Sequence, residues 1–110
     1  MDRIHEIIVV EGRHDTQQLK KYFDCETIET GGSSIDDKVI ERIRHAADTR
    51  GVIVFTDPDT PGNQIRHIIN QHVPNCKNAF VDKRNARTKK KVGIEHADKD
   101  TLWNALQNLV

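Results

Sequence analysis

In residues 52–62, VIVFTDPDTPG, an apolar β-branched run ends in Asp57 and Asp59 and then breaks on proline and glycine. An apolar run bounded by turn residues is typical of a buried strand, and carboxylates at the carboxyl end of such a strand indicate a cation site. Residues 7–12, IIVVEG, repeat the pattern with Glu11 followed by Gly12. If the two strands are neighbours, the side chains of Glu11, Asp57 and Asp59 converge on one point.

Strand-like runs at residues 5–10, 25–29, 51–56 and 78–81 alternate with helical patterns. This alternation predicts a single α/β domain over residues 1–110, a three-layer Rossmann-like sandwich whose four-stranded, mainly parallel sheet carries helices on both faces. A strand order of 2-1-3-4 places the reversal, where ligands bind in such sheets, between the strands that end in Glu11 and Asp57. The helices are expected to begin at Asp15 as N-cap, at Ser33 or Ser34, after Thr60 as cap, and at Asp100.

The charge of the chain is balanced overall but uneven locally, with 17 basic and 17 acidic side chains. Six cations within nine residues create a local positive potential suited to phosphates, although a solvated loop has the same composition. They are Lys83, Arg84, Arg87, Lys89, Lys90 and Lys91. No apolar run approaches the ~20 residues of a membrane span and no secretory pattern is present, so a cytoplasmic protein without a membrane partner is expected.

The three converging acids require a counter-charge. Carboxylates about 5 Å apart repel one another by roughly 3 kcal/mol per pair at an effective dielectric near 20. Mg²⁺ held by one or two carboxylates and several waters is the usual solution where a substrate carries phosphates. The alternatives are that one acid is protonated, or that Asp57 and Asp59 only cap the third helix and solvate a loop.

These elements together resemble the Toprim domain, the metal-dependent catalytic module of topoisomerases, bacterial primases and some nucleases. The resemblance rests on the strand with Glu11-Gly12, on Asp15 three residues beyond the glycine, and on the strand with Asp57-x-Asp59-x-x-Gly62. The Gly31-Gly32-Ser33 turn, and the basic stretch followed by VGIEHA at residues 92–97, are similar to the ribonuclease M5 branch, which matures precursor 5S ribosomal RNA.

The resemblance implies an endoribonuclease that cleaves a double-stranded region of precursor 5S ribosomal RNA. Glu11 would be a metal-associated acid that also acts as general acid or base, and Asp57 and Asp59 would hold one or two Mg²⁺ ions, with Mn²⁺ able to substitute. Members of the branch carry a further carboxyl-terminal region that docks the RNA with a 5S-binding ribosomal protein. We expect this chain to be the catalytic domain without that region.

Other residues are candidates for binding RNA or for supporting the site. Arg13 and the six cations of the basic stretch would contact the RNA backbone. The supporting candidates are Gly12, Asp15, Gly31, Gly32, Ser33, Gly62 and His96. Several have a purely structural alternative: Asp15 as a helix cap, the Gly31 to Ser33 turn as a cap rather than a phosphate cradle, Gly62 in a tight turn, and His96 in a loop.

Three other functions fit part of the pattern. The stretch FTDPDT at residues 55–60 resembles the nucleophile loop of haloacid-dehalogenase-type phosphatases, but that reading leaves Glu11-Gly12 unexplained. A Toprim domain acting on DNA has the same acids. A catalytically silent RNA-binding module would use the basic stretch alone, and acids in a polyanion site would weaken it unless a metal bridged them.

Overall fold

The computed structural model describes residues 1–32, 34–81 and 93–110. Its main sheet has the order β4-β2-β5-β6 and every pairing in it is parallel. The strands are β2 (Ile7–Val10), β4 (Thr27–Glu29), β5 (Val52–Val54) and β6 (Lys77–Asn78). The predicted 2-1-3-4 order is therefore confirmed, with shorter strands than the apolar runs indicated.

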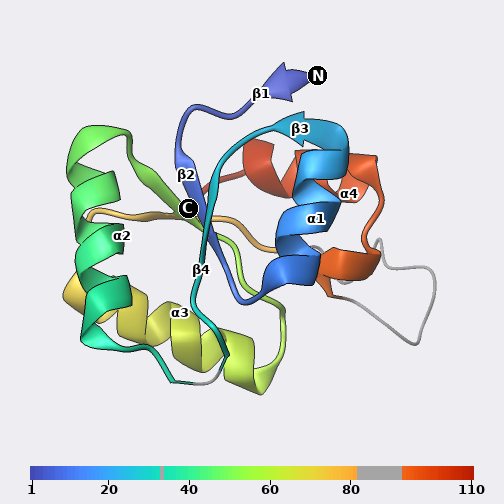
Figure 1. Cartoon of the computed structure of the whole chain (residues 1–110). Coiled ribbons are helices and arrows are strands. Elements are labelled where there is room, and N and C mark those ends of the chain that lie inside the picture. Colours follow the sequence, from blue (N-terminus) through green and yellow to red (C-terminus); the bar gives the residue numbers. More distant parts are fainter. Residues whose placement is uncertain (33, 82–92) are drawn as a thin grey trace.

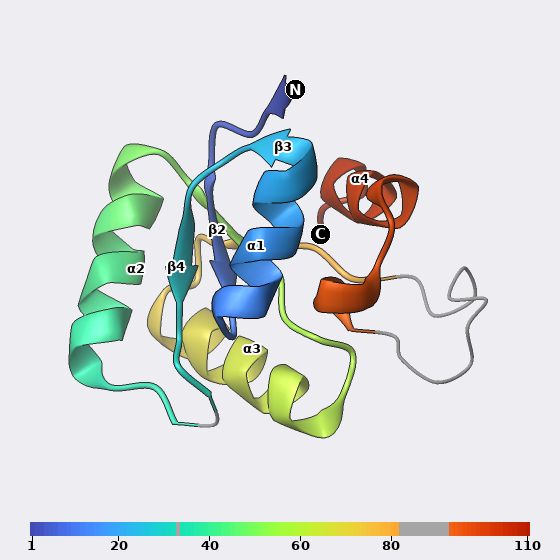
Figure 2. The same cartoon turned by 45° about the vertical axis from the view of Figure 1, so that its right-hand side comes forward.

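Helices cover both faces of this sheet (Figures 1 and 2). On one face lie α1 (Arg13–Tyr22) and α4 (Lys99–Gln107), and on the other lie α2 (Asp37–Thr49) and α3 (Thr60–His72). A short 3₁₀ helix, η2 (Ile94–His96), packs beside α1. The predicted three-layer α/β sandwich is confirmed.

The strands contribute side chains to two apolar clusters, because successive side chains of a strand point to opposite faces of the sheet. Ile8 and Val10 of β2 belong to the cluster under α1 and α4, whereas Val9 between them belongs to the cluster under α2 and α3. On the first face, Phe23 stacks on Trp103 of α4 with ring centroids 5.8 Å apart. Both faces of the sheet are thus covered by apolar side chains and helices, as is usual for a parallel sheet.

All four expected helix starts are wrong by at least one residue. α1 begins at Arg13, two residues before Asp15, because Gly12 is its N-cap. α2 begins at Asp37, capped by Asp36, and not at Ser33 or Ser34. α3 begins at Thr60 with Asp59 as its cap, so Thr60 is the first helical residue and not the cap. α4 begins at Lys99, capped by Asp98, and not at Asp100.

A two-residue parallel pair between β1 (Asp2–Arg3) and β3 (Phe23–Asp24) was not predicted. It fastens the amino terminus to the end of α1. Among the described residues, no helix is long and apolar enough to cross a membrane.

Candidate metal and phosphodiester site

The two strands that end in acids are direct neighbours, and their acids meet. β2 pairs in parallel with β5, with Val9 beside Val54, so the chain leaves both strands at the same edge of the sheet. There the backbone N–H of Asp57 donates a hydrogen bond of 2.8 Å to Oε2 of Glu11. The predicted convergence of Glu11 and Asp57 is therefore confirmed.

Asp59 is turned toward α3. Its Oδ1 accepts a 2.7 Å hydrogen bond from the N–H of Gly62, which makes it the helix N-cap. β5 ends at Val54, so Asp57 and Asp59 both lie in the loop before α3 and are not alternate residues of one strand. One carboxylate oxygen of Asp59 is thus committed to the helix, while its charge still acts on Glu11.

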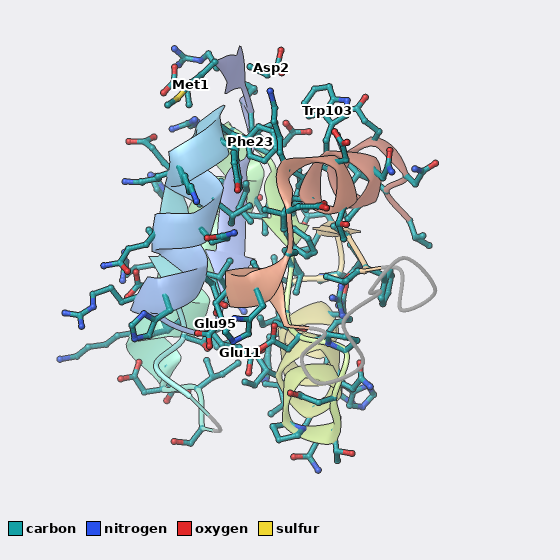
Figure 3. All side chains as sticks on the ribbon, turned by 90° about the vertical axis from the view of Figure 1, so that its right-hand side faces the viewer. Met1, Asp2, Glu11, Phe23, Glu95 and Trp103 are labelled. Atoms are coloured by element: carbon teal, nitrogen blue, oxygen red, sulfur yellow. The ribbon has the colours of Figure 1, made fainter. Side chains whose placement is uncertain are left out.

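Glu11 and Asp57 line a hollow of about 520 Å³, called here the acid hollow. Asp59 does not line it, so the predicted convergence of all three acids on one point is wrong for Asp59. Glu11 and Glu95 approach it from β2 and η2 (Figure 3). Its lining residues are Glu11, Gly12, Arg13, His14, Asp15, Glu29, Gly31, Gly32, Asp57 and Glu95. Carboxylates outnumber cations in this lining, so the hollow has a strongly negative potential.

Two carboxyl groups of the acid hollow have raised pKa values. Burial and, to a lesser degree, the charges of Asp57, Asp59 and Asp15 together raise the pKa of Glu11 to about 7, although the hydrogen bond from the Asp57 N–H lowers it. Burial, followed by the charge of Asp57, raises the pKa of Asp15 to about 6. Burial is the larger cause of both shifts and the neighbouring carboxylates add to it, so a dication bound to these oxygens would lower both pKa values.

The donor set fits a hard cation. Every anionic side chain at the acid hollow offers carboxylate oxygen, the ligand type that Mg²⁺, Mn²⁺ and Ca²⁺ prefer. Within residues 1–32, 34–81 and 93–110, no three Asp, Glu, His or Cys side chains form a ready-made cage. That arrangement suits an ion that keeps several waters and uses one or two protein carboxylates.

Asp15 has a double position. It is the third residue of α1, is 5 % exposed, and accepts a 3.1 Å hydrogen bond from the N–H of Gly12. It is therefore not the N-cap that the sequence predicted but an acid of the first turn that accepts from the N–H of the N-cap. Asp15 also lines the acid hollow, and its support of the site stays a prediction.

The glycines at the site are needed for different physical reasons. Gly31 and Gly32 have φ values of +84° and +117°, which favour glycine, and both line the acid hollow. They do not open a helix, because α2 begins at Asp37, so the expected position of this turn at a helix amino end, as a cap or as a phosphate cradle, is wrong. The N–H of Gly31 donates to the carbonyl of Glu11. Ser33 lies outside the described residues.

Two further glycines pack against Asp57. A Cβ on Gly62 would lie 2.1 Å from the carbonyl oxygen of Asp57, and one on Gly93 would lie 3.2 Å from its Oδ1. Glycine is therefore needed at position 62, because the backbone at the start of α3 lies close to the backbone of Asp57. The next residue after Gly93, Ile94, donates its N–H to Asp57 Oδ1 across 2.9 Å. Segment 93–96 thus holds the carboxylate of Asp57 in place.

Some residues at the site were not predicted from the sequence. Glu95 lines the acid hollow and raises the pKa of Asp15, although only its neighbour His96 was a candidate. His96 contacts Glu95 at 2.9 Å and lies outside the acid hollow. The VGIEHA segment itself was the available signal, since it combines an acid with glycine as residues 11–12 do.

Arg66 of α3 was also missed. Its guanidinium is 8 % exposed, lies 4.0 Å from the Phe80 ring centroid, and bonds to groups at the ends of β5 and β6. Its acceptors are the carbonyls of Val54, Thr56 and Ala79 and the side-chain oxygen of Asn78. Arg66 therefore ties α3 to the backbone from which Asp57 emerges.

Of the residues predicted to contact RNA, one lies in the part of the chain that the structure describes and six do not. Arg13 is exposed at the amino end of α1 and lines the acid hollow. Six of the predicted contacts lie outside the described residues: Lys83, Arg84, Arg87, Lys89, Lys90 and Lys91.

A three-layer sandwich with acids at the ends of two adjacent parallel strands is the arrangement expected of a domain that binds a divalent cation. The Toprim domain model matches residues 6–91, and the chain belongs to this family. Toprim domains generally bind divalent metal ions, which agrees with the donor set. A small Toprim domain protein from Bacillus stearothermophilus has the same fold, with a TM-score of 0.76 and 21 % identity over 97 % of this chain and 90 % of that one.

Within the family, the chain is similar to proteins named ribonuclease M5. It is 58 % identical over 106 residues to that of Lactococcus lactis, covering 94 % of this chain and 52 % of the relative. It is 52 % identical over 109 residues to that of Bacillus subtilis, covering 97 % of this chain and 59 % of the relative. The chain thus spans between half and three fifths of the length of these relatives.

Proposed function

We propose that this chain is the catalytic domain of a magnesium-dependent endoribonuclease that matures precursor 5S ribosomal RNA by cleaving its double-stranded region. The observation that carries the proposal is the meeting of Glu11 and Asp57 at the edge of the sheet, within an acid hollow whose carboxyls lack counter-charge. Identity of 58 % to a ribonuclease M5 over most of the chain supports the choice of substrate.

In this proposal Glu11, Asp57 and Asp59 hold one or two Mg²⁺ ions, for which Mn²⁺ can substitute. When bound, the metal supplies Lewis-acid stabilisation of the charge that develops on the phosphate. Glu11 is also the proposed general acid or base, because its carboxylate lies where the two strands meet at the edge of the sheet. The backbone N–H groups of Asp57 and Ile94 keep the Glu11 and Asp57 carboxylates oriented.

The remaining residues position the RNA. Arg13 and the six basic residues between 83 and 91 contact backbone phosphates without reading sequence, since an A-form helix hides its base edges from side chains. Docking of the whole precursor, together with a 5S-binding ribosomal protein, belongs to a carboxyl-terminal region like the part of the relatives that lies beyond the match. The division into a single domain over residues 1–110 and a cytoplasmic location are parts of the same proposal.

The test is cleavage of precursor 5S RNA with Mg²⁺, by this chain alone and by a chimera with the carboxyl-terminal part of the Lactococcus lactis relative. Asp57→Asn keeps the acceptor for the Ile94 N–H but removes the charge, so we expect the chimera to lose at least about 10²-fold in rate. Asp36→Asn, a helix cap at a distant point of the fold, is the matched control. Undiminished cleavage by Asp57→Asn would overturn the proposal.

A further inference from the structure

A second hollow, of about 330 Å³, lies between α1 and η2. We call it the α1–η2 hollow. Its lining residues are His14, Gln17, Gln18, Lys21, Glu95 and His96. The four residues from α1 are spaced three, four and seven apart, so they share one face of the helix.

The two walls of this hollow are fixed relative to each other. Nε2 of Gln18 donates a 2.6 Å hydrogen bond to the carbonyl of Ala97, just after η2. On the opposite wall, Nε2 of His96 lies 2.9 Å from Oε1 of Glu95. The hollow is therefore a formed feature of the surface and does not depend on a partner to open it.

The α1–η2 hollow adjoins the acid hollow. His14 and Glu95 line both, so a ligand that extends past these two side chains passes from one hollow into the other. Figure 3 shows Glu95 near Glu11 at the amino end of α1, where the hollows meet.

The two hollows differ in charge. The acid hollow is dominated by carboxylates, whereas the α1–η2 hollow offers the ammonium of Lys21, the imidazoles of His14 and His96 and the amide of Gln17. Its one carboxylate, Glu95, is engaged by His96. A phosphodiester in the acid hollow needs a metal, but in the α1–η2 hollow it meets cationic and neutral donors directly.

We propose that the α1–η2 hollow binds the backbone of the RNA strand next to the phosphodiester that is cleaved. The inference rests on the proposed function and deepens it, because it gives the strand a direction: along α1 from His14 toward Lys21. Lys21 contacts a phosphate flanking the cut, and Gln17 contacts the sugar or phosphate between. Such contacts set the register of the strand and carry no sequence preference.

The chain contains a matched pair for the test, Lys20 and Lys21. Both are exposed in the last turn of α1, so their substitution changes net charge and helix dipole alike, but only Lys21 lines the hollow. The measurement is fluorescence anisotropy of a labelled RNA hairpin, copied from the double-stranded cleavage region, in chelator and over a range of salt. Chelator removes the metal, so the readout is independent of catalysis.

Lys21→Gln is expected to weaken binding roughly threefold to tenfold and to reduce the slope of log K against log salt by about one. Lys20→Gln is expected to leave both close to wild type. Lys21→Glu should weaken binding more than Lys21→Gln, since it places an anion beside the phosphate. Equal effects of the Lys20 and Lys21 variants, or no effect of either, would overturn the inference.

The failure of this inference is distinguishable from the failure of the proposed function. If wild type cleaves the RNA, Asp57→Asn does not, and the Lys20 and Lys21 variants bind alike, the function stands and the strand runs elsewhere. If Asp57→Asn cleaves as wild type does, the proposed function fails whatever the lysine variants show. Binding that depends on Lys21, together with cleavage that depends on Asp57, supports both.

Discussion

The backbone N–H of Asp57 donates a 2.8 Å hydrogen bond to Oε2 of Glu11, joining the ends of two adjacent parallel strands. The bond orients the carboxylate of Glu11, and burial together with the charge of Asp57 raises the pKa of that carboxylate. The site thus holds its acids together although they repel, and a bound dication would relieve that repulsion.

The first prediction concerns pH. In chelator, folded Glu11 keeps its proton up to a pKa of about 7, whereas the unfolded chain loses it near 4.5. The folded state therefore binds more protons in this window, so the stability that Glu11 contributes is present below about pH 4.5 and is lost as the pH rises toward 7. Glu11→Gln, which keeps an acceptor for Asp57, removes this loss.

The measurement is urea denaturation of wild type and Glu11→Gln at several pH values. After allowance for solvent screening at this half-buried site, we expect wild type to lose about 1–2 kcal/mol relative to the variant between pH 4.5 and 8. Mg²⁺ should restore the loss in wild type only. A constant difference between the two proteins across this range would contradict the prediction.

The second prediction separates the charge of Asp59 from its role as a cap. Asparagine caps helices as well as aspartate does, so Asp59→Asn should keep the bond to the Gly62 N–H and leave the melting temperature close to wild type. It should nevertheless reduce cleavage by at least about tenfold, because a metal ligand or nearby charge is gone.

Asp98 supplies the control, because it caps α4 through the N–H of Thr101 in the same way. Asp98→Asn should leave both the melting temperature and cleavage unchanged. If Asp59→Asn cleaves as fast as Asp98→Asn does, then Asp59 is only a cap.

The sequence was sufficient to predict the strand order of the sheet and the meeting of Glu11 and Asp57 at its edge. Apolar runs alternating with helical patterns imply parallel strands, and acids that end adjacent parallel strands must meet, which placed Glu11 and Asp57 correctly. Helix starts were less certain, because several polar residues in a row can each act as a cap. In the folded chain the N-cap of α2 is Asp36 and not Ser34, and the N-cap of α1 is Gly12 and not Asp15, because the tertiary structure decides where each helix begins.

Glu95 and Arg66 could not be placed from periodicity. Glu95 reaches the acid hollow only because η2 packs beside α1 and its Ile94 bonds to Asp57, a contact 37 residues apart in sequence. Arg66 lies on the inner side of α3, where the helical pattern of apolar residues gives no reason to expect a buried cation. Its carbonyl partners exist only once β5 and β6 are paired.

The third prediction concerns the buried cation. Arg66→Met removes a donor from four acceptors, of which the Val54 carbonyl keeps the Ala79 N–H and the Asn78 oxygen keeps the Asn70 amide. The buried carbonyls of Thr56 and Ala79 lose their arginine donor, each at a cost of about 1–3 kcal/mol, so the variant should lose at least about 2 kcal/mol of unfolding free energy. Arg66→Lys should lose less, because an ammonium has three donors in place of five. Urea denaturation measures both. Arg42→Met, at an exposed arginine of α2, is the control, and an equal loss in Arg42→Met would refute the assignment.

The fourth prediction uses the glycines around Asp57. Gly62→Ala would place a Cβ 2.1 Å from the Asp57 carbonyl oxygen, so α3 or the loop must shift, at a cost of about 1–3 kcal/mol. Gly93→Ala, with a φ of −77° and a Cβ 3.2 Å from Asp57 Oδ1, should fold nearly normally but displace the carboxylate. Cleavage should then fall about tenfold to a hundredfold. Wild-type cleavage by Gly93→Ala would show that the position of Asp57 Oδ1 is not critical.

The most direct measurement is calorimetric titration of Mg²⁺ into wild type, Glu11→Gln, Asp57→Asn and the Asp98→Asn control at pH 8. That pH lies above the Glu11 pKa of about 7, so the site is fully charged. We predict that wild type and Asp98→Asn bind the ion alike, whereas Glu11→Gln and Asp57→Asn each bind it about tenfold or more weakly. Equal affinity in all four proteins would contradict the claim that these two acids meet to hold a metal.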